Sequence, residues 1–92
     1  RHKRLVEGFL RAAARGDESA ARSKLSPAAA ITMGDNDALG LAELGERLRG
    51  ANWAKVIAAG STVVVSVACD HGRGILFAEV AWRGNQINAV HW

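Results

Sequence analysis

The apolar residues in the first part of the chain recur every three to four positions, which is the period of an α-helix. One side of a helix over residues 2–15 collects Leu5, Val6, Phe9, Leu10 and Ala13. Gly16 can end this helix in the left-handed conformation, and the carboxylate of Asp17 can cap a second helix over 17–25. Pro27 cannot continue that helix, so two short helices joined at Gly16 are predicted.

A third helix is predicted over residues 38–49, because three leucines recur there at helical spacing before Gly50. The apolar period then changes to two, which is typical of strands with one buried face. Strands are predicted over 55–59, 62–70, 74–83 and 86–92, with a shorter one at 28–32. The pairs Gly60-Ser61, His71-Gly72 and Gly84-Asn85 between them are typical of tight turns. The pattern therefore predicts an α+β fold with an antiparallel meander.

The two faces of this meander carry different side chains. With a two-residue turn at His71-Gly72, the pairs on one face are Val67 with Leu76, Val65 with Ala78, and Val63 with Val80. This face is wholly apolar, and Trp82 extends it. The opposite face carries Val64, Ile75 and Phe77, which is too apolar for a surface in full contact with water. We therefore predict a homodimer that buries this outer face.

Composition limits the setting of the protein. The 92 residues suffice for one domain with a single core, and 49% apolar with 23% charged residues is typical of a globular chain. Cys69 is the only cysteine, so no internal disulfide is expected. No segment has the composition of a signal peptide or a membrane span. We therefore expect a cytoplasmic location.

The net charge of +3 is concentrated at the start of the chain, where five of the first fifteen residues are basic. Arg4, Arg11 and Arg15 project opposite to the apolar side of the first predicted helix, as on an ordinary solvated helix face. No aromatic residues alternate with these charges, whereas binders of single-stranded nucleic acid use aromatic rings for base stacking. Direct binding of nucleic acid is therefore not expected.

Metal and cofactor sites are not expected either. Cys69, Asp70 and His71 are adjacent, and successive side chains of a strand point to opposite faces, so they cannot converge on one ion. His2 and His91 lie far apart in the sequence, and the chain has neither an H-x-x-x-H nor a C-x-x-C spacing. No glycine-rich segment has the spacing of a phosphate-binding loop between a strand and a helix.

The end of the first predicted helix reads "FLRAAARGD", Gly40 leads into the third helix, and "GNQI" turns into the last strand. Together these segments resemble the SnoaL-like branch of the nuclear-transport-factor-2-like (NTF2-like) superfamily, and the resemblance extends over nearly all of the chain. It implies a conical α+β barrel, in which three helices lie across a strongly curved mixed sheet and leave a cavity at the open end. None of these segments is a catalytic signature.

The resemblance allows a residue-by-residue test against enzymes of that superfamily. Ketosteroid isomerases carry an oxyanion-hole tyrosine, a carboxylate base and a protonated carboxylic acid inside the cone. These positions match Phe9, Met33 and Ala78, and the chain contains no tyrosine, so steroid isomerisation is not expected. Relatives of limonene-epoxide hydrolase carry an aspartate early in the last strand, where this chain reads Val90-His91-Trp92. Their Asp/Arg/Asp relay is therefore not expected.

His91 and Asp35 are the candidate catalytic residues. A two-residue turn at Gly84-Asn85 aims the His91 imidazole into the cone, where it could act as a general base near pH 7. A bulge in that turn would instead bring Asn88 and Trp92 inward. Asp35 borders the predicted pocket mouth and could approach a ligand, or cap the third helix as loop carboxylates commonly do.

Two functions of different class are consistent with these residues. In the first, the cone holds an apolar small molecule, with or without a polyketide-cyclase-like reaction that depends mainly on positioning. The residues predicted to line this pocket are Phe9, Met33, Trp53, Val65, Ala78, Val80 and Trp82, joined by His91 in the two-residue-turn register.

In the second function the chain is a regulatory module without catalysis. The segments "VIAAGSTVVVSV" and "GRGILFAEVAWRGNQI" closely resemble the C-terminal SnoaL-like domain of extracytoplasmic-function sigma factors. Many of those domains contact the neighbouring sigma region through an Asp-Gly-Gly-Gly-Lys motif. This chain has Gly34-Asp35-Asn36-Asp37 at that place, so it departs from the motif.

Overall fold

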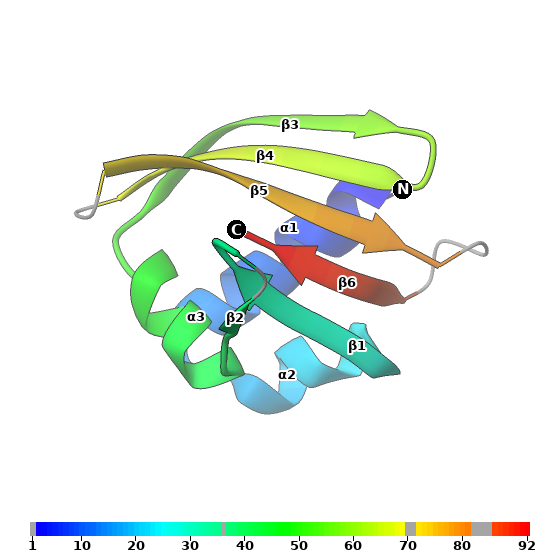
Figure 1. Cartoon of the computed structure of the whole chain (residues 1–92). Helices are drawn as coiled ribbons and strands as arrows, with labels where there is room; N and C mark the ends of the chain where they lie inside the picture. Colours follow the sequence, from blue (N-terminus) through cyan, green and yellow to red (C-terminus); the bar gives the residue numbers. More distant parts are fainter. Residues whose placement is uncertain (1, 36, 70–71, 82–85) are drawn as a thin grey trace.

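Three helices lie across one face of a strongly curved six-stranded sheet (Figure 1). The computed structural model describes residues 2–35, 37–69, 72–81 and 86–92. The helices are α1 (His2–Ala14), α2 (Glu18–Ser23) and α3 (Leu41–Leu48). The strands are β1 (Leu25–Met33), β2 (Asp37–Ala38), β3 (Asn52–Ala59), β4 (Thr62–Cys69), β5 (Gly72–Val80) and β6 (Ile87–His91). The predicted α+β fold, with helices packed on a curved mixed sheet, is confirmed.

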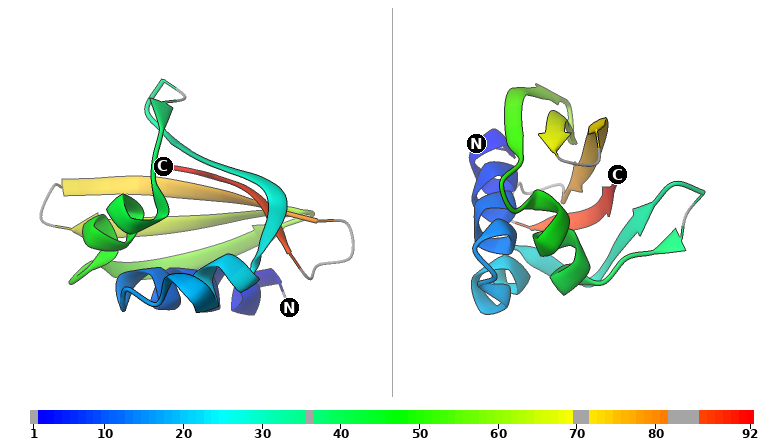
Figure 2. Two further views of the ribbon diagram at one scale, coloured as in Figure 1. Left: turned by 90° about the horizontal axis from the view of Figure 1, so that it is seen from below. Right: turned by 90° about the vertical axis from the view of Figure 1, so that its left-hand side faces the viewer.

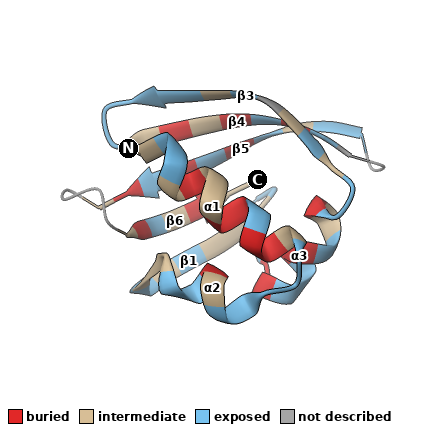
Figure 3. Cartoon of the chain, turned by 180° about the vertical axis from the view of Figure 1, so that it is seen from behind, coloured by how far each residue is buried: buried red, intermediate tan, exposed pale blue. Residues whose placement is uncertain are grey.

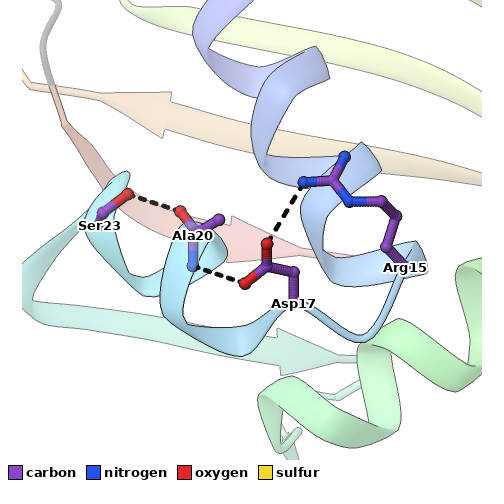
Figure 4. Close-up of polar contacts among 4 residues, drawn as sticks. All are labelled: Arg15, Asp17, Ala20 and Ser23. Atoms are coloured by element: carbon purple, nitrogen blue, oxygen red, sulfur yellow. Dashed lines mark hydrogen bonds and ion pairs between the residues drawn. The ribbon is translucent and has the colours of Figure 1, made fainter.

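The joint between α1 and α2 is built as the sequence predicted (Figure 4). Gly16 has a φ of 78°, in the left-handed region that favours glycine. Asp17 Oδ1 accepts a hydrogen bond from the backbone amide of Ala20 at 3.2 Å, which is an N-terminal cap. The Arg15 guanidinium lies 3.5 Å from the Asp17 carboxylate, and Ser23 Oγ donates to the Ala20 carbonyl at 2.6 Å.

Several strand boundaries differ from those predicted. The strand predicted at 28–32 extends over Leu25–Met33, because pairing with β6 begins directly after α2. β2 is absent from the predicted elements, since two residues are too few for an alternating pattern. β3 begins at Asn52 rather than at residue 55, and β5 runs from Gly72 to Val80 rather than over 74–83.

The strand order is β2-β1-β6-β5-β4-β3, and the pairing of β1 with β6 is parallel while the other neighbours are antiparallel. The antiparallel meander predicted for the last four strands is therefore confirmed. Figure 2 shows how the sheet curls over the helices, and how the β1–β2 hairpin extends away from the rest of the sheet.

The register between β4 and β5 differs from the predicted one by two residues. The observed pairs are Cys69 with Gly72, Val67 with Gly74, Val65 with Leu76, and Val63 with Ala78. The predicted turn at His71-Gly72 is therefore wrong. Because side chains alternate with a period of two, a shift of two residues leaves the same side chains on each face.

The register between β5 and β6 shifts by one residue, which exchanges the faces. Phe77 pairs with His91, and Ala78 pairs with Val90. The pairing is irregular between Glu79 and Val80, where Asn88 is the extra residue on β6. His91 therefore lies on the outer face with Phe77, and the prediction that its imidazole enters the cone is wrong.

The alternative prediction, with a bulge that turns Asn88 and Trp92 inward, is correct for one of the two residues. Trp92 packs against the core and lies against Gly74 on the inner face. Asn88 is exposed, because it is itself the extra residue of the irregularity.

The inner face of the sheet and the apolar sides of the helices form one core (Figure 3). The buried helical residues of this core are Val6, Phe9, Leu10, Ala12, Ala13, Ala21, Leu41, Leu44 and Leu48. The buried strand residues are Val63, Val65, Val67, Leu76, Ala78, Val80, Ile87 and Val90. α1 and α3 approach so closely that a side chain at Gly45 would overlap the Ala13 carbonyl. None of the helices in the described ranges has both the length and the apolar character that crossing a membrane requires.

Candidate functional site

Four of the predicted pocket residues are part of the packed core. Phe9, Val65 and Ala78 have no exposed surface, and Val80 is 4% exposed. Val65 pairs with Leu76, which is also fully buried, and Phe9 faces the sheet from α1. These four side chains therefore form the floor beneath any site on the inner face. Trp82, also predicted to line the pocket, lies outside the described residues.

The other two predicted pocket residues, Met33 and Trp53, belong to a half-buried group at one end of the inner face. Trp53 on β3 pairs with Val67 on β4, and Val67 pairs with Gly74 on β5. The indole of Trp92, the residue after β6, lies directly against Gly74. We refer to Met33, Trp53, Val67, Gly74 and Trp92 as the rim cluster.

Two backbone hydrogen bonds fix Trp92 beside the end of β1. Its amide donates to the carbonyl of Thr32 at 3.0 Å, and its own carbonyl accepts from the amide of Gly34 at 3.0 Å. Met33 lies between these two partners in the sequence, so the ends of β1 and β6 hold Met33 and Trp92 next to each other. The sequence pattern indicated Trp92 only through the bulge alternative, because its orientation depends on the register of β6.

The rim cluster offers apolar contact and almost no polar chemistry. Met33, Trp53 and Trp92 are half-buried, so each presents part of a thioether or an aromatic ring at the surface. Such groups suit flat or irregular apolar molecules. Across the described residues, no polar or charged residue is buried, so the interior beneath the rim supplies no acid or base.

His91 is separated from the rim cluster by the sheet itself. Its Nδ1 is hydrogen-bonded to Thr32 Oγ1 at 2.7 Å, on the outer face opposite Phe77. In this position the imidazole cannot reach a molecule held on the inner face. A role as a general base inside the cone is therefore incompatible with the observed register.

Asp35 lies in the exposed turn between β1 and β2, directly after Gly34. Gly34 has a φ of 57° and is the residue that bonds to the Trp92 carbonyl. Asp35 is thus two residues from Met33, on the hairpin that borders the rim cluster. Asp37 is exposed in β2.

Among the residues that the structure describes, two surface hollows lie away from this site. One of about 430 Å³ is found where α2 leads into β1 and includes Arg22, Pro27 and Gln86 in its lining. The other, of about 160 Å³, lies between α1 and α3 beside Gly45. Neither is lined by a residue predicted for the pocket. Within the described ranges, no three His, Cys, Asp or Glu side chains gather in a way that could hold a metal ion.

The outer face carries a second candidate surface. A row across the strands contains Ile57, Val64, Phe77, His91 and Thr32. Ile57 is 55% exposed, Phe77 43%, and the neighbouring Ile75 52%, so three large apolar side chains lie in contact with water. Exposed apolar patches of this kind commonly mark interaction surfaces.

Comparison with known proteins identifies the fold. No family model matches the chain, and no curated protein matches it in sequence. An NTF2-like protein of unknown function from Cytophaga hutchinsonii superposes with a TM-score of 0.70 at 13% identity, over 99% of this chain and 87% of that one. AclR of Streptomyces galilaeus superposes with a TM-score of 0.62 at 13% identity, over 98% and 75%.

A de novo designed protein with a curved β-sheet is also similar, with a TM-score of 0.66 at 21% identity, over 98% of this chain and 81% of that one. At such identities the likeness is one of fold alone. The likeness extends over nearly the whole of this chain.

Proposed function

Since the chain has the NTF2-like fold, as its sequence resemblance implied, we propose that it binds an apolar small molecule at the rim cluster. The observation that carries this proposal is the half-burial of Met33, Trp53 and Trp92 at one end of the inner face. The apolar residues deeper in the core are fully buried. Small-molecule sites are typically recesses lined by apolar and aromatic side chains with few polar groups.

We propose binding through contact area and orientation, with no acid–base group from the interior. A polyketide-cyclase-like reaction at this site would depend on how the substrate is positioned, with Asp35 as its nearest candidate acid. The exposed carboxylate of Asp35 on the β1–β2 hairpin would then meet the polar end of the molecule. The proposed site keeps Met33 and Trp53 of the lining predicted from the sequence, whereas Phe9, Val65, Ala78 and Val80 are buried beneath it.

Binding of the neutral apolar dye N-phenyl-1-naphthylamine tests the proposal. We expect Trp53→Ala to weaken dye binding about tenfold, the effect of losing an aromatic contact worth about 1.4 kcal/mol. The matched control is Ile57→Ala, which removes an apolar side chain from the outer face of the same strand. Equal loss in both variants, or no binding by the wild type, would contradict the proposal.

A second proposed function, as an interaction module, is favoured by the exposed apolar residues of the outer face. We propose that Val64, Ile75 and Phe77 meet a second copy of the chain. In the regulatory-module alternative, a neighbouring domain would occupy this face instead of a second copy. Both arrangements would remove apolar surface from water, which favours association.

The charges around the apolar row support a second copy as the occupant. Lys55 on β3 pairs with Ser66, and Glu79 on β5 pairs with Thr62, so the two charges lie at diagonally opposite corners around Val64. The Glu79 carboxylate is held there by Thr62 Oγ1, which donates to it at 2.6 Å. Two copies can pack with these faces together, related by a twofold axis that lies between the sheets and runs perpendicular to this diagonal. Lys55 of each copy then lies over Glu79 of the other copy.

A further inference from the structure

The contact between Trp92 and Gly74 determines which residue position 74 can hold. A side chain there would overlap the nitrogen of the Trp92 indole. Gly74 is not among the glycines with a positive φ, so its backbone conformation would accept another residue. Glycine inside a strand weakens the strand, and commonly marks a place where another group approaches the backbone closely. Here the approaching group is the indole ring.

The Trp92 ring can leave Gly74 without disturbing the sheet. The backbone of Trp92 is held by its hydrogen bonds to Thr32 and Gly34, whereas the side chain is only half-buried. Rotation about the side-chain torsions is therefore sufficient to move the ring toward solvent. Such rotations are fast for partly exposed side chains, on the order of nanoseconds.

We propose that the Trp92 indole is an internal occupant of the rim cluster, and that an apolar molecule binds there by displacing the ring from Gly74. This inference rests on the proposed function and adds that the chain's own side chain closes the site when no ligand is bound. The vacated surface is the flat peptide backbone of Gly74, between Val67 and the end of β6. It fits a planar ring of about the size of indole, because that is what it holds now.

The two tryptophans of the rim cluster then act in opposite directions on binding. Trp53 contacts the ligand, so its loss weakens binding. Trp92 competes with the ligand, so its loss strengthens binding. When only a fraction of the molecules is competent to bind, the apparent Kd rises by the inverse of that fraction. If the ring is away from Gly74 in about one-tenth of the molecules, the apparent Kd is about tenfold higher than the Kd of the open site.

Titration of the 92-residue chain with N-phenyl-1-naphthylamine distinguishes these roles. We expect Trp92→Ala to bind the dye about tenfold more tightly than the wild type, and Trp53→Ala to bind it about tenfold more weakly. Arg73→Ala is the matched control, because Arg73 is exposed and precedes Gly74 on the same strand. Its affinity should stay within about twofold of the wild type.

Gly74→Ala provides an independent variant should Trp92→Ala unfold. Its methyl group occupies the surface of the strand that the indole and the dye would share, so we expect weaker dye binding although the tryptophan remains. Indole itself gives a second measurement. It should raise the melting temperature of Trp92→Ala by filling the vacated space, and should leave the wild type unchanged.

The dye titrations distinguish failure of the inference about Trp92 from failure of the proposed function. If Trp92→Ala weakens dye binding as Trp53→Ala does, Trp92 is a wall of the site, which overturns the inference and leaves the proposed function standing. Unchanged affinity in both Trp92→Ala and Gly74→Ala also overturns the inference. If neither the wild type nor any variant binds the dye, the proposed function fails and the inference fails with it.

Discussion

The small residues of the interior differ in which neighbouring group their small size accommodates. Gly74 leaves room for the Trp92 indole, and Gly45 leaves room for the carbonyl of Ala13. Ala78 pairs with Val63 and Val90 and has no exposed surface. Its methyl group is therefore packed among other buried side chains.

We expect Ala78→Phe to destabilise the fold by about 1–3 kcal/mol, because the ring must be forced into a filled core. Urea denaturation measures the change in free energy of unfolding. Ala68→Phe is the matched control, since Ala68 is exposed on the outer face, and its effect should stay within about 0.5 kcal/mol. Full stability of Ala78→Phe would indicate unfilled space beside residue 78, and would favour the deep pocket predicted from the sequence.

Among the elements, α2 is the one whose stability depends most on a single hydrogen bond. It has six residues and one buried side chain, Ala21, so packing contributes little to it. The bond from the Ala20 amide to Asp17 satisfies one of the amides that the first turn leaves without a partner.

Asp17→Ala should therefore cost about 1 kcal/mol of unfolding free energy, as for other N-terminal caps. Asp17→Asn keeps the hydrogen-bond acceptor but removes the negative charge, and should cost much less. The ion pair with Arg15 is exposed, and pairs of this kind contribute little. Thermal denaturation of the two variants separates the contributions, and equal destabilisation by both would assign the effect to the charge.

The sequence predicted the elements well where the signal is local. Helical spacing of apolar residues located α1 and α3, and Gly16, Asp17 and Pro27 indicated where α2 begins and ends. The alternation along β4 and β5 assigned Val65 and Ala78 to the inner face, even though the predicted pairing was wrong by two residues.

The candidate site was harder to predict because it depends on strand register. The irregularity at Asn88 moves His91 outward and Trp92 inward, and neither residue carries a local signal of that shift. The burial of Phe9, Val65, Ala78 and Val80 likewise depends on how closely α1 packs on the sheet. Periodicity indicates the face on which a side chain lies, and it does not indicate whether a cavity lies above it.

At the scale of the whole molecule, the fold does not determine the function. A designed protein shares the curved sheet and the helices that cover it, so this architecture is not evidence of a particular activity. This chain carries apolar surfaces on opposite faces of one sheet, the rim cluster inside and the row around Phe77 outside.

We expect the wild type to sediment as a dimer at tens of micromolar and Phe77→Glu to sediment as a monomer, because a buried, unpaired carboxylate opposes association. Ala42→Glu, on the exposed side of α3, adds the same charge elsewhere and should leave the dimer intact. Exchanging the charges of Lys55 and Glu79 together should preserve it. A monomeric wild type would favour a neighbouring domain as the partner of this face.

The parallel pairing of β1 with β6 sets the order in which the chain can fold. Thr32 and His91 are bonded across 59 positions of sequence, whereas β3, β4 and β5 pair through short connections. Pairing of distant segments is slow, since the entropy of closing a long loop is lost before contacts are gained. Besides β6, the strand neighbour of β1 is β2, which has two residues. During synthesis, β1 in the first third of the chain therefore cannot join the sheet until residues 87–91 have been made.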